Sequence, residues 1–219
     1  MSWSTVSVSK RRQTSRRGAG RRRPSAARRR RSALVLGGIA LAVLALALAL
    51  PMFQKAVNEL ALPLHHQDII RQQAAEKRLD PALVAAVIYA ETKFDARTSP
   101  AGAEGLMQIL PQTAMFLAHR SGAQTFTTAD LATPQVNIAY GSYYLRYLLD
   151  QYGGASTLAL AAYNGGETNV NRWIAAAKAQ GHALTAEAIP FPETRAYVLK
   201  VLGAQRDYRR TYHAQLGYG

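Results

Sequence analysis

The sequence predicts an all-α domain that follows a basic tail and one long apolar segment. Beyond residue 50, apolar side chains recur at the three- and four-residue spacing of helices, whereas the alternation typical of strands is almost absent. Prolines stand where several of these periodic segments begin, and glycines stand where several end, as is typical of helix starts and stops. The composition also changes sharply between the tail, the apolar segment and the remainder of the chain.

The first 32 residues form the basic tail. They hold 12 of the 27 Lys and Arg residues and none of the 13 acids, which leaves 15 cations against 13 acids, a net charge of +2, for residues 33–219. A nucleic-acid-binding arm would need interleaved aromatic residues, and Trp3 is the only one in the tail. We therefore expect residues 1–32 to be a disordered cytoplasmic segment that helps to orient the chain, and we expect no nucleic acid as a partner.

The next segment is long enough to cross a membrane. Residues 33–50 carry no charge, and as a helix they would span roughly 27 Å at about 1.5 Å per residue. Because arginines cluster at the N-terminal end, the positive-inside rule places the tail in the cytoplasm. We expect a single-pass anchor in the inner or cytoplasmic membrane at 33–52, a linker at 53–63 and an exported folded domain at 64–219. A cleavable signal peptide is left open as the alternative.

The helices of the exported domain can be placed in order. They are expected at residues 66–78, 81–93, 111–120, 134–152, 155–163, 167–180 and 192 to about 212. The first is amphipathic, and the second opens at Asp80 and Pro81, an N-cap residue followed by a proline at the first helical position. The third, fourth and last also open at prolines, and the glycine pairs at 153–154 and 165–166 end the fourth and fifth. Residues 106–110 are expected to form only a short turn, because a proline follows them.

Glu91 stands near the end of the most apolar helix, residues 81–93. Val84, Val87 and Ile88 precede it by seven, four and three residues, so the carboxyl ends an apolar stripe on one helix face. Burial and the negative end of the helix dipole both raise the pKa of a carboxyl at this position. A carboxyl that stays protonated near neutral pH is suited to act as a general acid.

A purely structural role is the alternative for Glu91. The carboxylate would then be satisfied by an arginine of another helix, for which Arg195 and Arg172 are the candidates. The neighbouring sequence favours a site instead. Residues 105–108 supply an amide and a thioether after a turn, and residues 162–166 supply a phenol and a second amide beside two glycines. Amides and aromatic rings are the groups that a site needs to hold N-acetylated sugar rings.

Four segments carry a more specific pattern: ETKF (91–94), SPAGAEGLMQILPQTA (99–114), AYNGG (162–166) and FPETRAYVLKVL (191–202). In this order and spacing they resemble the motifs of the soluble-lytic-transglycosylase (SLT) family, relatives of goose-type lysozyme. The resemblance extends over about residues 64–212 and implies a lysozyme-like helical domain with a central cleft. One departure is Thr92, where the family often has serine. Threonine keeps the hydroxyl, so we still expect activity.

The resemblance also implies roles for individual residues. Glu91 matches the single catalytic acid/base of the family. Six further positions match substrate-binding residues: Ser99, Met107, Gln108, Tyr163, Asn164 and Tyr197. In the family the serine orients the catalytic carboxyl, the methionine packs on the glycan and the glutamine hydrogen-bonds to it. The A-Y-N residues face the N-acetyl group and the carboxyl, and the late tyrosine lies beside the catalytic glutamate. A role as core filler is left open for Met107.

The reaction that the resemblance implies is non-hydrolytic cleavage of the β-1,4 bond between N-acetylmuramic acid and N-acetylglucosamine in peptidoglycan. Glu91 would protonate the leaving oxygen and then accept the proton of the muramic acid 6-hydroxyl, which leaves a 1,6-anhydro product. Peptidoglycan glycan strands would be the partner, and recruitment by a cell-wall synthesis or secretion complex is left open. No cofactor is implied, and no metal is expected, because the chain has no Cys and its five His show no H-x-x-x-H spacing.

Two other functions are left open, a hydrolytic muramidase on the same fold and a catalytically idle glycan-binding module. A hydrolase that uses two carboxylates needs the second at about 5 Å for retention or about 6.5–9.5 Å for inversion. The candidates are Asp95, Glu104, Glu167 and Glu193. They stand in turns or at helix starts, and their surroundings do not suggest burial beside Glu91. A lone acid assisted by the substrate fits the sequence better.

Overall fold

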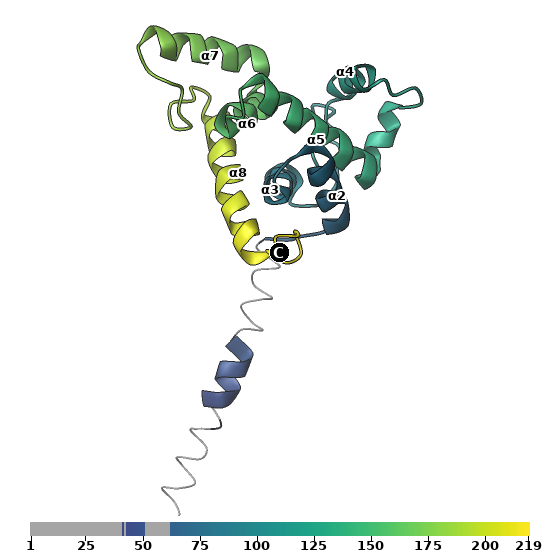
Figure 1. Ribbon diagram of the computed structural model, residues 1–219, viewed down its shortest axis with the longest axis vertical. Helices are drawn as coiled ribbons and strands as arrows, with labels where there is room; N and C mark the ends of the chain where they lie inside the picture. Colours follow the sequence, from purple (N-terminus) through teal and green to yellow (C-terminus); the bar gives the residue numbers. More distant parts are fainter. Residues whose placement is uncertain (1–40, 42, 51–61) are drawn as a thin grey trace, which may run out of the picture. The chain divides into compact units, whose positions relative to one another are not determined.

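The computed structural model describes residues 41, 43–50 and 62–219 (Figure 1). The chain divides into two compact units, Met1–Phe53 and Gln54–Gly219. The second unit contains every residue for which the sequence predicts a catalytic or substrate-binding role.

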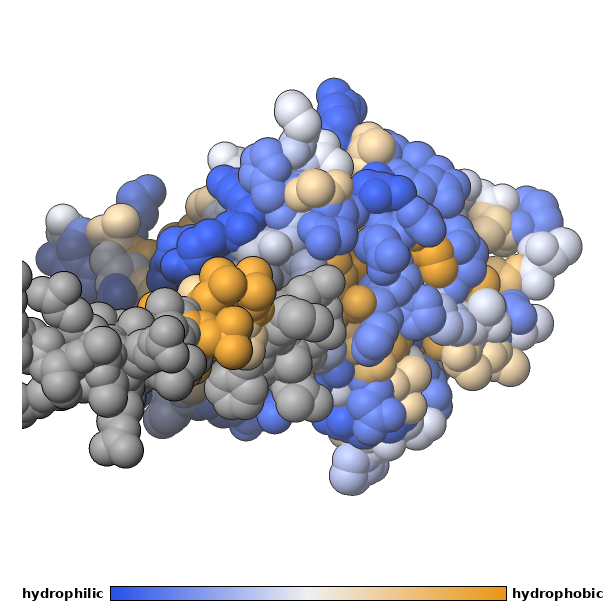
Figure 2. Space-filling model, turned by 90° about the horizontal axis from the view of Figure 1, so that it is seen from below, coloured by the Kyte–Doolittle hydropathy of each residue, from blue (hydrophilic) through white to orange (hydrophobic). Residues whose placement is uncertain are grey.

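In the first unit, residues 41 and 43–50 are helical and their leucines are exposed. They are the orange group between two grey segments in Figure 2. Within the described residues, no helix is both long and apolar enough to cross a bilayer. The predicted tail at 1–32, residues 33–40, 42 and 51–52 of the predicted anchor, and residues 53–61 of the predicted linker lie outside the described residues.

The second unit is helical in its described part. Its elements in chain order are α2 (Gln67–Lys77), α3 (Pro81–Thr92), α4 (Pro111–Ser121), η1 (Thr128–Ala132), α5 (Pro134–Gln151), α6 (Ser156–Gly165), α7 (Glu167–Ala179) and α8 (Pro192–Thr211). Residues 62–219 contain no strand, and only one isolated antiparallel bridge joins Glu104 to Ile109. The predicted all-α class is confirmed for these residues.

Each predicted helix begins within one residue of its expected start, because the starting signals are local. At the start of α3, the Asp80 carboxylate accepts a hydrogen bond from the Ala82 amide at 3.0 Å, and Pro81 occupies the first helical position. The prolines expected to open α4, α5 and α8 do so.

Two details differ from the sequence prediction. Helix α6 runs two residues further than expected, to Gly165, and Gly166 separates it from α7 with a φ of 82° that favours glycine. The prediction also omits η1. Asp130 opens this short helix by accepting hydrogen bonds from the amide and hydroxyl of Thr127 at 2.8 and 3.0 Å. Five residues are too few to show a helical period, so only the cap could have revealed it.

Helix α3 lies in the interior of the second unit. Figure 1 shows it almost end-on, with α8 on one side and α2 on the other, and it packs against both. Residues 82–88 are each at most 4% exposed. The predicted stripe of Val84, Val87 and Ile88 is fully buried, and the residues between them are buried as well, because neighbouring elements cover the other sides of the helix too.

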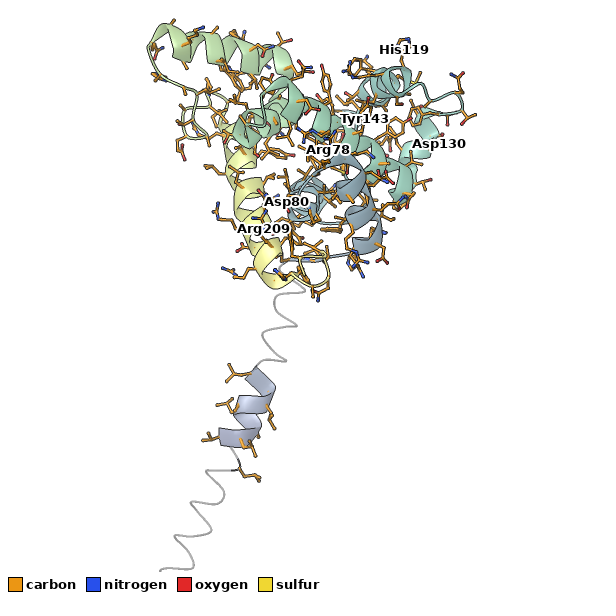
Figure 3. All side chains as sticks on the ribbon, viewed as in Figure 1. Arg78, Asp80, His119, Asp130, Tyr143 and Arg209 are labelled. Atoms are coloured by element: carbon orange, nitrogen blue, oxygen red, sulfur yellow. The ribbon has the colours of Figure 1, made fainter. Side chains whose placement is uncertain are left out.

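A polar cluster joins the first turn of α3 to the end of α8. The Asp80 carboxylate accepts hydrogen bonds from Tyr218 and Gln205 and pairs with Arg209. Figure 3 shows Asp80 and Arg209 meeting between the two helices. Because the start of α3 meets the end of α8, the two helices run antiparallel. The end of α3 that carries Glu91 consequently lies beside the first half of α8.

Candidate active site

Glu91 lies in the last turn of α3 and is partly buried. Burial raises the pKa of its carboxyl from an ordinary value of 4.5 to about 7. The Tyr197 hydroxyl and the positive charges of Lys200 and Arg97 act in the opposite direction and limit the rise. A carboxyl with a pKa close to neutrality can either give or accept a proton near pH 7.

Two cations secure the helix end that carries Glu91. Arg97 donates hydrogen bonds to the backbone carbonyls of Glu91 and Thr92 at 3.2 and 3.5 Å, and Lys200 donates to the carbonyl of Ala90 at 2.9 Å. Positive groups at this end of a helix offset the partial negative charge of its last carbonyls. The sequence analysis missed both residues, because Lys200 is 109 positions from Glu91 and Arg97 lies in an irregular loop.

The structural alternative for Glu91, an arginine partner from another helix, is not found. Arg195 donates to the carbonyl of Ile189 at 3.1 Å, and Arg172 donates to the side chain of Asn169. In residues 62–219, no Lys, Arg or His nitrogen lies within ion-pair distance of the Glu91 carboxylate. The carboxyl is thus buried without an ion pair, as the functional interpretation requires.

Two tyrosines lie close to the Glu91 carboxyl. Tyr163, on α6, donates a hydrogen bond from its hydroxyl to the backbone carbonyl of Met107 at 2.9 Å. The buried Tyr197 hydroxyl, on α8, lies near enough to lower the pKa of Glu91, yet it satisfies hydrogen-bond geometry with no described group. Burial, and then the charge of Glu91, raises the pKa of both phenols well above the ordinary value. Both therefore remain protonated donors at neutral pH.

The loop after α3 holds Ser99 and Gln108 in fixed positions. The Ser99 hydroxyl oxygen accepts a hydrogen bond from the Ala103 amide at 2.9 Å, which leaves its own hydrogen free to donate. Gln108 has a φ of 49°, uncommon for a residue with a side chain. Its amide nitrogen donates to the carbonyls of Arg97 and Gly105 at 2.7 and 2.8 Å, so its amide oxygen is the part left for a ligand.

Met107 and Asn164 occupy opposite environments. The Met107 side chain is fully buried, and a Cβ at Gly141 of α5 would lie only 2.4 Å from its sulfur. This position favours the core-filling interpretation of the thioether, and the predicted contact with a glycan stays a prediction. Asn164, in the last turn of α6, is exposed, so its amide is accessible to a ligand.

The sequence analysis also missed Asn137, the buried residue that fixes this loop to α5. Its side-chain oxygen accepts from the Met107 amide at 2.8 Å, and its nitrogen donates to the carbonyls of Glu104 and Leu131 at 2.8 and 3.0 Å. The Asn137 side chain can approach the loop only because residue 105 is glycine: a Cβ there would clash with the Asn137 nitrogen, at a distance of 2.2 Å. An asparagine in the first turn of α5, three residues after the proline that opens the helix, was the only sequence signal.

Thr92 supplies a second link between α3 and the loop. Its buried hydroxyl donates to the carbonyl of Leu106 at 2.8 Å. The hydroxyl that the sequence retains at this position therefore anchors the chain immediately before Met107 and Gln108.

Within residues 62–219, none of the four candidate carboxylates is found to act on Glu91. Asp95 and Glu193 are exposed, the Glu104 carboxylate accepts from the Thr98 hydroxyl at 2.8 Å, and that of Glu167 accepts from the Tyr147 hydroxyl at 3.3 Å. None of these four is among the charged groups that shift the pKa of Glu91. In the described part of the chain, no group of three or more His, Cys, Asp or Glu side chains could hold a metal ion.

Comparison with known sequences identifies similar proteins. The family model described as "Transglycosylase SLT domain" matches residues 68–185, more than half of the chain. The chain is 33% identical over 150 residues to the soluble lytic murein transglycosylase of Escherichia coli. The aligned region covers 67% of this chain and 23% of that protein. It is also 30% identical over 164 residues to the membrane-bound lytic murein transglycosylase C of Cronobacter sakazakii. This aligned region covers 65% of this chain and 46% of that protein.

The similar solved structures are also lytic transglycosylases. The lytic transglycosylase Slt of Pseudomonas aeruginosa, solved as an inactive glutamate-to-glutamine mutant, superposes with a TM-score of 0.65 at 30% identity over 72% of this chain and 26% of that one. The 70 kDa soluble lytic transglycosylase of Escherichia coli superposes with a TM-score of 0.64 at 31% identity. The match covers 70% of this chain and 25% of that one. The chain thus spans about a quarter of the length of the soluble relatives that it matches.

Proposed function

Because the chain belongs to the transglycosylase SLT domain family, we propose that it is a lytic transglycosylase acting on peptidoglycan, with Glu91 as its sole catalytic acid/base. The observation that carries the proposal is a solitary carboxyl of raised pKa at the end of a buried helix, beside two protonated phenols. The names of the relatives, murein transglycosylases, support the substrate class. The inactive glutamate-to-glutamine mutant of the Pseudomonas relative supports a glutamate as the essential group.

In the first step, protonated Glu91 donates its proton to the glycosidic oxygen. The bond between C1 of N-acetylmuramic acid and this oxygen breaks, and N-acetylglucosamine leaves with a free 4-hydroxyl. Positive charge develops at C1 of the muramic acid ring. With no protein carboxylate nearby to stabilise that charge, the acetamide oxygen of the substrate does so, which agrees with the single acid at this site.

In the second step, the Glu91 carboxylate acts as a base. It accepts the proton of the muramic acid 6-hydroxyl while the 6-oxygen attacks C1, so that a 1,6-anhydro ring forms and the carboxyl is protonated again. A pKa of about 7 allows the same group to serve in both directions at neutral pH. Water is not consumed, which distinguishes the reaction from hydrolysis.

The residues around Glu91 receive supporting roles in this proposal. The free hydrogen of the Ser99 hydroxyl orients the carboxyl, and the amide oxygen of Gln108 accepts from the glycan. The phenol of Tyr197 donates toward the carboxyl, whereas the phenol of Tyr163, whose hydrogen goes to the Met107 carbonyl, offers its oxygen as an acceptor beside the carboxyl and the acetamide. The exposed Asn164 amide binds the sugar, and Met107 supports the loop from the core.

Tyr197→Phe separates a functional hydroxyl from a structural one. Because this buried hydroxyl makes no hydrogen bond of full geometry and the Glu91 carboxyl is the side chain that it acts on, we expect the free energy of unfolding to change by less than about 1 kcal/mol. We expect the rate of muropeptide release to fall about tenfold or more. Tyr163→Phe, which loses the bond to Met107, should instead cost about 1 kcal/mol of stability. Urea denaturation and release assays check both, and full activity of Tyr197→Phe would contradict the assigned role.

The product identifies the reaction. Detergent-solubilised full-length protein is incubated with purified peptidoglycan, and the released muropeptides are identified by mass spectrometry. We expect products that end in 1,6-anhydromuramic acid. Reducing-end products would assign a hydrolytic muramidase, and binding without release would assign a glycan-binding module.

The membrane location is part of the same proposal. Residues 33–52 would anchor the protein in the inner or cytoplasmic membrane with the tail inside, and the short stretch at 53–63 would keep the catalytic domain near the outer face of the bilayer. The membrane-bound relative from Cronobacter supports such a location by its name. Retention of the intact chain in membranes after alkaline extraction is the expected result, and release of a shortened chain would favour a cleaved signal peptide.

A further inference from the structure

The described part of the second unit starts beside the end of α8. The Tyr212 hydroxyl donates a hydrogen bond to the Leu62 carbonyl at 2.8 Å, and the Tyr208 hydroxyl donates to the Pro63 carbonyl at 2.5 Å. Figure 1 shows this entry of the chain and the last turn of α8 at the same end of the unit. In the proposed topology residues 53–61 join the anchor to Leu62, and nine residues span at most about 32 Å. This end of the domain is therefore tethered close to the bilayer.

Basic side chains gather at this end of α8. Arg206, Arg209, Arg210 and His213 are exposed, and together with Gln205 they line a pocket of about 450 Å³, with no carboxylate among these lining residues. Cations in the last turn of a helix offset the partial charge of its final carbonyls, which accounts for Arg209 and Arg210. It does not account for Arg206, which lies one turn earlier, or for His213, which lies beyond the helix. We refer to these five residues as the arginine pocket.

Two of the arginines are available to an anion from outside. Arg210 pairs with Asp207 at 2.8 Å, but its side chain is 79% exposed, and such surface pairs contribute little to stability. Within residues 62–219, no Asp or Glu oxygen lies within 4.0 Å of an Arg206 nitrogen. Arg209 is committed elsewhere, because it pairs with Asp80 between α3 and α8 (Figure 3). Arg206 and Arg210 are therefore the guanidinium groups that can turn to a ligand.

We propose that the arginine pocket docks the domain on the membrane surface by binding the phosphate groups of anionic phospholipids. The inference goes beyond lytic activity and rests only on the membrane location proposed above. A guanidinium group donates two parallel hydrogen bonds to phosphate oxygens, and an anionic surface attracts it within a Debye length of about 8 to 10 Å. The short tether keeps the pocket near the lipid, so that individually weak contacts suffice at the high local concentration.

Docking at this end gives the candidate active site a defined place relative to the bilayer. The start of α3, at Asp80, meets the end of α8. Glu91 is eleven residues further along α3, about 16 Å by the helical rise. The docked contact therefore leaves the acid uncovered and accessible to glycan strands.

A spin label tests the docking directly. Because the chain contains no cysteine, one introduced cysteine can carry the label at a chosen site. Ala214→Cys places it at an exposed position next to His213, and Ala176→Cys places it at an exposed position on α7, at the other end of the unit (Figure 1). Full-length protein is reconstituted in nanodiscs of phosphatidylcholine, alone or with an equal amount of phosphatidylglycerol. Relaxation of the label by a nickel-chelating lipid reports its contact with the bilayer surface.

We expect the label at position 214 to relax at least about threefold faster when phosphatidylglycerol is present, and the label at position 176 to show no difference. Arg206→Gln/Arg210→Gln should remove the difference, as should salt of about 0.5 M, which screens the attraction. Both arginines are exposed, so an unchanged urea midpoint is expected for this variant. Arg172→Gln/Lys178→Gln, which removes the same charge from exposed positions on α7, is the matched control and should keep the difference.

Three outcomes would overturn the docking. One is equal relaxation at position 214 in both kinds of nanodisc, and another is a double arginine variant that keeps the difference. The third is a double variant that loses binding to sedimented peptidoglycan while the lipid signal stays unchanged, which would assign the pocket to the cell wall.

These measurements are separate from the proposed activity. None of them needs cleavage of peptidoglycan, so an inactive enzyme would still show the lipid-dependent signal. The basic tail is common to all variants, so its own attraction to anionic lipid cancels in the comparison. Failure of the anchor shows separately, as release of the chain by alkaline extraction, and would overturn the docking through its premise.

Discussion

Glu91→Gln should reduce the release of anhydro-muropeptides by about 10³-fold or more. The single carboxyl serves in both proton transfers of the proposed reaction, and no other acid in the described part of the chain acts on it. The amide of glutamine keeps the size of the side chain but can neither donate nor accept the proton. Release of muropeptides from purified peptidoglycan, quantified by mass spectrometry at pH 7, gives the rate. The matched control is Glu193→Gln, an exposed glutamate in the first turn of α8, which should retain full activity.

The same substitution should stabilise the protein at high pH. In the folded chain the pKa of Glu91 is raised from 4.5 to about 7, so the folded state binds a proton more tightly than the unfolded state does. The favourable contribution of this group is complete below about pH 4.5 and is lost as the pH rises through about 7. Above pH 7 the ionised carboxylate costs the folded state about 3 kcal/mol, from a pKa difference of about 2.5 units.

Urea denaturation of Glu91→Gln and of the native protein at pH 4 and pH 8 measures this effect. We expect nearly equal free energies of unfolding at pH 4, and up to about 3 kcal/mol in favour of the variant at pH 8. Inactivity together with unchanged or higher stability would identify Glu91 as a functional group. Inactivity with a lower free energy of unfolding at both pH values would instead mean that the variant no longer folds correctly.

Asn137→Ala should cause the largest loss of stability among the substitutions considered, about 3 to 4 kcal/mol. The side chain is 1% exposed and makes three hydrogen bonds to backbone groups of the loop at 104–107 and of Leu131. Its removal leaves the Met107 amide and two carbonyls without partners in a buried place. Urea denaturation at pH 7 provides the measurement. We also expect reduced activity, because Gln108 follows directly on the loop that Asn137 holds.

Asn171→Ala serves as the matched control for Asn137→Ala. Asn171 is exposed on α7 and accepts one hydrogen bond from the Tyr152 hydroxyl at 3.2 Å. Its loss should change the free energy of unfolding by less than about 0.5 kcal/mol. If Asn137→Ala proved equally mild, the loop would have to be held mainly by Thr92 and the Glu104–Ile109 bridge.

The helices could be predicted from the sequence because their signals are local. Asp80 and Pro81 set the start of α3 through bonds within one turn, and the prolines at 111, 134 and 192 set the starts of three more helices. The burial of the remaining sides of α3 has the opposite origin. The sequence shows which residues are apolar, but only the packing of α8 and α2 shows that every side of the helix is covered.

The candidate site was predictable where it depends on one segment. Glu91 was found from its own helix, since an acid at the end of an apolar run is unusual wherever the helix packs. Ser99 and Gln108 were found by resemblance, and the loop that holds them is built from contacts that no spacing reveals. Asn137 reaches this loop from α5, more than 30 residues away along the chain.

By itself, the sequence determined the all-α class of the described domain and its helix starts, and it singled out Glu91 as the candidate acid, because each depends on hydrogen bonds and periodicity within a few residues. The tertiary structure alone decided what surrounds that acid. It brought Tyr197 and Lys200 from α8 and Tyr163 from α6 to Glu91, and it left the other candidate carboxylates elsewhere. The pKa of a carboxyl depends on the burial and charge that distant segments impose, so only the packed fold could raise this one to about 7.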